Sequence, residues 1–104
     1  MHELAVMQKC NNSVMEIPYL KDNQFAVGKA QYSTGIVLRN DGTIYKSGQS
    51  VNEIYEIFDN YSEAELFVLS KISDNPEIEC WIVNAKGEHV ITYDKQGKRN
   101  FKNS

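Results

Sequence analysis

One stretch of the chain, residues 58–94, restricts the fold more than any other because its pattern describes a helix followed by two strands. Apolar residues recur at helical spacing from Ala64 to Ile72. Pro76 cannot continue a helix and disfavours helical geometry at the residue before it, so the helix has to stop shortly before that point. We therefore predict one main helix over residues 62–74.

The predicted start of this helix is a capping box. The Ser62 side chain can accept a hydrogen bond from the amide of Glu65, and the Glu65 carboxylate can accept one from the amide of Ser62. Tyr61 and Leu66 stand where a hydrophobic staple would join the residue before the helix to its first full turn. The apolar face is expected to pack in the core, and it comprises Ala64, Leu66, Phe67, Val68, Leu69 and Ile72.

After the helix, the sequence predicts two strands joined by a turn at residues 84–87. The loop is either Lys86-Gly87 or all four residues, and both lengths divide the side chains between the two faces in the same way. One face is expected to pack under the helix and carries Ile78, Cys80, Ile82, Ile91 and Tyr93. The other carries Glu79, Trp81, Val83, Val90, Thr92 and Asp94. The apolar residues of this second face are either covered by another part of the chain or open to another molecule.

The amino-terminal half reads as a series of short strands. Residues 3–9 and 24–31 predict two of them, with Phe25 and Val27 on one face of the second. Residues 14–20 contain a proline, which restricts them to an edge strand or an extended segment. This half is therefore expected to be rich in β-structure.

A hairpin is predicted over residues 34–47, around the turn sequence Asn40-Asp41-Gly42. A two-residue loop would set Arg39 opposite Ile44. A three-residue loop, with its glycine in the left-handed region, sets Leu38 opposite Ile44. The second arrangement pairs apolar with apolar across the strands, so we predict the three-residue loop.

Residues 50–58 allow two interpretations. Ser50 and Glu53 have the spacing of a second capping box, and apolar residues follow at helical spacing. Residues 55–58 can instead form a short strand. We expect a helical turn at 50–54 and an extended segment at 55–58, because two turns of helix are marginal alone.

Together these elements predict an α+β fold. It consists of a mostly antiparallel sheet of about five to six strands, with the main helix packed on one face. A chain of 104 residues is expected to form a single domain over residues 1–104. Residues 95–104 contain one apolar side chain among several basic ones, and we expect a mobile basic tail there.

The residue types that carry catalysis or metal binding occur in no recognisable pattern. Cys10 and Cys80 are far apart, and only His2 and His89 could complete a zinc site. Cys80 lies in a strand pattern, where cysteine behaves as a small hydrophobe. Phosphate-binding loops and the common hydrolase motifs are absent from the sequence. We predict no cofactor, no metal site and no enzymatic activity.

The amino-terminal residues do not suggest a secreted protein. The first nine residues carry a charge on each side of a short apolar run, unlike a signal peptide. Apolar runs stay far below the length of a membrane span. A cytoplasmic location without membrane contact is therefore expected.

The net charge of −3 conceals an uneven distribution along the chain. Acids and bases balance over residues 1–54, whereas residues 55–93 carry eight acids against two lysines, and the remaining residues are basic. This segment is either a solvated surface or one suited to a basic protein partner. Its sign argues against direct nucleic-acid binding.

The run Phe58 to Glu65, followed by Asn75 to Ile82 and by Lys86-Gly87, resembles a pattern of small bacterial α/β proteins. Some of these are similar to immunity proteins of polymorphic toxin systems. The resemblance covers about residues 55–95 and rests on the strand–helix–hairpin order. It implies a cytosolic, non-enzymatic inhibitor that masks the active surface of a toxin, such as a basic nuclease.

The hypothesis that follows is a protein-binding module, plausibly an immunity or inhibitor protein. Its predicted partner-binding residues are Asp59, Glu63, Glu77, Glu79, Trp81, Val83 and Val90. Acids would steer association, and the tryptophan would supply most of the affinity. The alternatives are a small-ligand-binding or enzymatic domain with a pocket between helix and sheet, and a self-associating accessory protein such as a homodimer.

Overall fold

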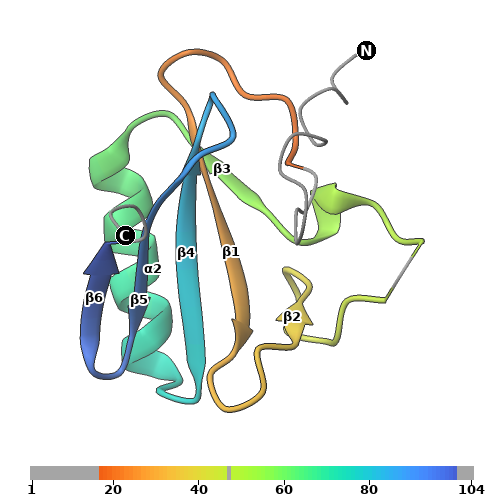
Figure 1. Ribbon diagram of the computed structural model, residues 1–104, viewed down its shortest axis with the longest axis vertical. Helices are drawn as coiled ribbons and strands as arrows, with labels where there is room; N and C mark the ends of the chain where they lie inside the picture. Colours follow the sequence, from red (N-terminus) through yellow and green to blue (C-terminus); the bar gives the residue numbers. More distant parts are fainter. Residues whose placement is uncertain (1–16, 47, 101–104) are drawn as a thin grey trace.

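The computed structural model describes residues 17–46 and 48–100, the last three by their backbone alone (Figure 1). The predicted strand at 3–9 and the first part of the segment at 14–20 lie outside these residues. The elements, in chain order, are β1 (Phe25–Gln31), β2 (Val37–Leu38), the 3₁₀ turn η1 (Val51–Glu53), β3 (Glu56–Phe58), α2 (Tyr61–Asp74), β4 (Ile78–Asn84), β5 (His89–Asp94) and β6 (Gly97–Asn100).

The strands of the described residues form one antiparallel sheet in the order β2-β1-β4-β5-β6, and α2 packs on one of its faces (Figure 1). β4 pairs with the whole length of β1. The other edge of β1 is shared, since β3 pairs with its first half and β2 with its second. The predicted α+β class, with about five to six strands and one main helix, is confirmed.

The helix spans the predicted residues but begins at a different cap. Asn60 is extended, and its side chain accepts a hydrogen bond from the amide of Glu63 at 2.9 Å. The predicted capping box at Ser62 is therefore wrong. Asparagine caps as well as serine, and the earlier start brings Tyr61 edge-on against Phe25, with ring centroids 5.6 Å apart. The Glu65 carboxylate instead accepts a hydrogen bond from the Tyr93 hydroxyl.

The inner face of α2 is narrower than predicted. Ala64 and Val68 are fully buried, with Phe67 and Ile72 packed beside them. Leu66 and Leu69 are 67% and 48% exposed, so the staple through Leu66 and the wide apolar face are wrong. Leu66 is two residues from both Ala64 and Val68, which places it about 200° around the helix from each of them.

Two hydrophobic clusters lie on opposite faces of the sheet. The cluster under α2 contains Val27, Leu38, Ala64, Val68, Ile78, Cys80, Ile82, Ile91 and Tyr93. The cluster on the far face contains Leu20, Ala26, Ala30, Ile54, Tyr55, Trp81 and Val83. The predicted helix-side residues of β4 and β5 are confirmed, as is the shared face of Phe25 and Val27. β1 and β4 contribute to both clusters and so join the two layers.

The β4–β5 hairpin departs from both predicted loop lengths. The amide of Asn84 donates to the carbonyl of Glu88 at 3.0 Å, which leaves a three-residue loop ending in Gly87 at φ 83°. The register then shifts between Ile82 and Val83. As a result Val90 packs on the helix-side cluster instead of the far face, and His89 takes its place opposite Val83. This bulge corrects the predicted position of Val90.

The earlier loops follow their predictions more closely. Leu38 pairs with Ile44, and Gly42 has φ 92°, as the three-residue loop requires. The strands of this hairpin are shorter than expected, because only β2 is regular. The turn at 50–54 and the extended segment that follows are confirmed as η1 and β3.

Residues 95–100 form a turn and a strand where the sequence predicts a mobile tail, and residues 101–104 of that tail lie outside the described residues. Asp94 accepts a hydrogen bond from the amide of Gln96 at 2.8 Å, which closes a tight turn. β6 then pairs with β5 from Gly97 to Asn100. The sheet thus extends one strand further than a tail beginning at Lys95 would allow.

Candidate protein-binding surface

Trp81 and Val83, two of the predicted partner-binding residues, are buried on the far face of the sheet. Trp81 is 8% exposed and lies edge-on to the Tyr55 ring, with centroids 6.1 Å apart. Its indole Nε1 donates to the Tyr55 hydroxyl at 3.2 Å. Leu20 and Ile54 complete the cover. The apolar residues of this face are therefore covered by another part of the chain and are not open to another molecule.

Asp59 and Glu63 lie together at the amino-terminal end of α2. Both are exposed, and they flank the cap residue Asn60. The Asp59 carboxylate accepts a hydrogen bond from Gln24 Nε2 at 3.1 Å, which ties this end to the turn before β1. Their negative charges also favour the positive end of the helix dipole. These are the two predicted residues that the fold brings close to one another on the surface.

Glu77 and Glu79 are separated from that pair. Glu77 follows the end of α2, where its carboxylate lies 3.9 Å from the Lys95 ammonium. Glu79 is half-buried on β4 opposite Ala30, on the same face as Trp81. Val90 packs on the helix side of the sheet. The predicted set is therefore divided between the two ends of α2 and the two faces of the sheet, and it does not form one patch.

The outer face of α2 was missed by sequence reasoning. Its exposed residues follow one row of the helix surface and comprise Ser62, Glu63, Leu66, Leu69, Ser70 and Ser73. The positions of the residues around the helix axis, which follow from the sequence, could have revealed this outer face. Once Ala64 and Val68 are assigned to the core, a helix with 3.6 residues per turn has to direct Leu66 outwards.

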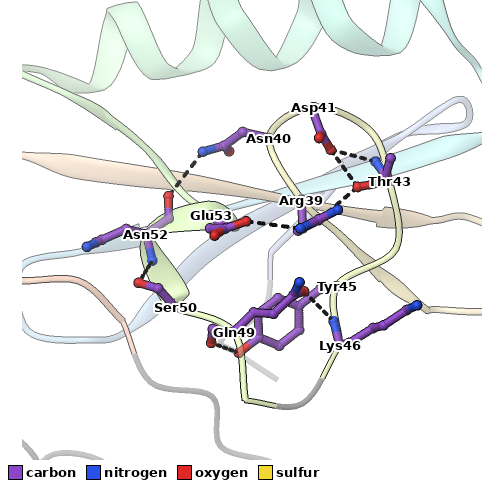
Figure 2. Close-up of polar contacts among 10 residues, drawn as sticks. All are labelled: Arg39, Asn40, Asp41, Thr43, Tyr45, Lys46, Gln49, Ser50, Asn52 and Glu53. Carbon is purple, nitrogen blue, oxygen red and sulfur yellow. Dashed lines mark hydrogen bonds and ion pairs between the residues drawn. The ribbon is translucent and has the colours of Figure 1, made fainter.

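A second group of polar side chains joins the hairpin loop to η1 (Figure 2). Arg39 Nη1 lies 3.2 Å from the Glu53 carboxylate, and its Nε donates to the Thr43 hydroxyl at 2.8 Å. Asn40 Nδ2 donates to the carbonyl oxygens of Asn52 and Tyr55. The contacts of Arg39 with Glu53 and of Asn40 with Asn52 cross between the two segments (Figure 2), so their evident role is to hold the hairpin loop against η1.

Two buried ionisable groups face each other across β1 and β4. Lys29 and Cys80 are cross-strand partners on the helix side of the sheet. Burial raises the pKa of the Cys80 thiol to about 12, so the thiol stays protonated at neutral pH. Burial also lowers the pKa of the Lys29 ammonium, an effect that the charge of Lys71 reinforces. A protonated thiol is a poor nucleophile, which agrees with a packing role for Cys80.

An open hollow lies beside the Asp59 end of α2. It is lined by Tyr19, Lys21, Asp22, Asn23, Gln24 and Asp59. Among residues 17–46 and 48–100, no group of three histidine, cysteine or acidic side chains is arranged to hold a metal ion. No helix in the same part of the chain is long and apolar enough to cross a membrane.

Comparisons with protein-family models, with curated proteins and with solved structures found no match to this chain.

Proposed function

We propose that this protein is a non-enzymatic protein-binding module that masks a basic protein partner, in the manner of an immunity or inhibitor protein. The observation that carries the proposal is the sign of the exposed charge in residues 55–93. Five acids of this segment are exposed, namely Asp59, Glu63, Asp74, Glu77 and Glu88. Of its two lysines, Lys86 is exposed and Lys71 is half-buried, with its Nζ over the Phe67 ring.

Such a surface favours a basic partner for a physical reason. Exposed charges of one sign raise the encounter rate with a protein of the opposite sign and orient it before contact. The effect is screened by salt, because the Debye length falls from about 30 Å at 0.01 M to about 8 Å at 0.15 M. A nucleic acid, which is also negative, would be repelled.

The alternative of a ligand pocket between helix and sheet has less support. The described residues of that interface form a packed cluster, with Ala64, Val68 and Ile82 fully buried. A ligand would have to displace these side chains to bind there. We therefore place the proposed binding site on the outside of the molecule.

The proposal is tested by capture from a lysate of the source cells at low and high salt, followed by measurement of the association rate with the captured protein. We expect a basic partner that is lost as salt rises and whose own activity returns when the complex is dissociated. The double variant Asp59→Asn/Glu63→Gln should slow association several-fold and weaken its salt dependence. Glu77→Gln, at the other end of α2, reports whether that end also takes part.

The proposal fails if the specific partners are acidic or neutral. It also fails if removing both charges at Asp59 and Glu63, together with that of Glu77, leaves the association rate unchanged at low salt.

A further inference from the structure

The outer face of α2 presents two large apolar side chains to solvent. Leu66 and Leu69 are three residues apart and so lie side by side on the helix surface. Neither belongs to the clusters that hold the sheet together. A single exposed leucine is ordinary, but here the two lie on one helix face among small side chains. Their exposed neighbours on that face include Ser62, Ser70 and Ser73, whose side chains are smaller.

The exposed charges of the helix lie at its two ends and have the same sign. Glu63 stands in the first turn and Asp74 is the last residue. The single lysine of the helix, Lys71, is turned aside, with its Nζ 5.3 Å from the centroid of the Phe67 ring. Along the helix axis, the leucines therefore lie between two carboxylates, and no exposed base lies on their face.

We propose that this face of α2, defined by Leu66 and Leu69 between Glu63 and Asp74, is the docking surface for a partner that presents an apolar groove rimmed by lysine and arginine. This inference rests on the proposed function and names the surface that performs it. Apolar contact with the leucines would supply affinity by removing both side chains from water. The flanking carboxylates would set the orientation by pairing with the basic rim.

Charge complementarity selects this occupant over a second copy of the chain. In an antiparallel pairing of two α2 helices through their leucines, Glu63 of one helix would approach Asp74 of the other. In a parallel pairing, the two Glu63 carboxylates would gather at one end of the pair and the two Asp74 carboxylates at the other. Both arrangements place like charges together, which disfavours them. A basic rim around an apolar groove meets the same surface without that penalty.

The test uses the full chain labelled with ¹⁵N and three short peptides of about 14 residues. The first combines leucine and lysine at helical spacing, the second replaces every lysine by glutamate, and the third contains lysine without leucine. We expect the leucine–lysine peptide to shift the amide signals of residues 62–73. We expect the leucine–glutamate peptide to bind at least about tenfold more weakly, because it repeats the sign of the helix ends.

Two double variants locate the contact. Leu66→Ser/Leu69→Ser should weaken the leucine–lysine peptide at least about tenfold. The matched control is Ile36→Ser/Ile44→Ser, which removes two similar side chains, 41% and 44% exposed, from the β2 hairpin region. It should leave that affinity unchanged. All four side chains are exposed, and an otherwise unchanged spectrum shows that each variant has kept its fold.

Each other outcome overturns the inference in a way that separates it from the proposed function. Equal binding of the leucine–lysine peptide to the leucine variant shows that the outer face is not the dock. If the lysine peptide then still binds near Asp59 and Glu63, the basic-partner proposal survives alone. If neither basic peptide binds, the docking inference falls, and capture of the partner at low and high salt still decides the basic-partner proposal. A concentration-dependent dimer that the leucine variant abolishes identifies the occupant as a second copy.

Discussion

Gly28 shows how closely single residues are fitted on the far face of the sheet. A Cβ placed on Gly28 would lie 2.4 Å from the nearest atom of the Trp81 indole. Gly28 and Trp81 face each other across β1 and β4, and the ring fills the space that the glycine leaves. Gly28→Ala should therefore force the ring to shift and cost about 1–3 kcal/mol of unfolding free energy, measured by urea denaturation. In a Trp81→Leu background, Gly28→Ala should lower the unfolding free energy much less. An equal loss in both backgrounds would contradict the close contact between Gly28 and the Trp81 ring.

At the scale of elements, the sequence offers two residues, Asn60 and Ser62, as the cap of α2, and only one of them serves as the cap. The Asn60 side chain accepts from the Glu63 amide, whereas Ser62 is exposed within the first turn. Asn60→Ala should lower the unfolding free energy by about 1 kcal/mol, because one amide at the start of the helix loses its partner. Ser62→Ala should stay within about 0.5 kcal/mol of the unaltered protein. Thermal or urea denaturation of the two variants measures both losses of unfolding free energy. A larger loss for Ser62→Ala than for Asn60→Ala would show that Ser62 is the cap.

The same element shows what could be predicted from the sequence and what could not. The extent of α2 and the helix-side face of β4 follow from local periodicity and from Pro76, so they were predictable. The cap was not, because Asn60 and Ser62 both suit that position locally and Tyr61 decides between them by packing on Phe25. Val90 was misplaced because a bulge changes the register without changing the alternating pattern.

The candidate site was the least predictable part, because it depends on contacts between distant segments. The sequence shows that Trp81 and Val83 share a face, but their cover comes from Leu20, Ile54 and Tyr55. None of these three belongs to the two strands of the hairpin. Conversely, the apolar character of Leu66 predicts a core position, whereas its angle around the helix directs it to solvent. The acidic sign of residues 55–93 could be read directly, since it depends on composition alone.

At the scale of the whole molecule, one sheet separates two apolar layers and belongs to both. β1 directs Val27 towards α2 and Ala26 towards Trp81, and β4 alternates in the same way. A layer cannot lose its packing without uncovering one face of both strands. We therefore expect the two layers to unfold together as one cooperative unit.

This cooperativity can be measured because each layer has its own signal. Trp81, the single tryptophan, reports on the far layer by fluorescence, and α2 reports on the other by far-UV circular dichroism. The two urea midpoints should coincide. Ile54→Ala in the far layer should cost about 2–4 kcal/mol and move both midpoints equally, because Ile54 is fully buried. Val68→Ala, made under α2, should likewise move both. If Ile54→Ala lowered the fluorescence midpoint alone, the far layer would be able to open while α2 stayed packed. Trp81 would then become accessible in a partly folded state, and the closed far face would no longer separate it from a partner.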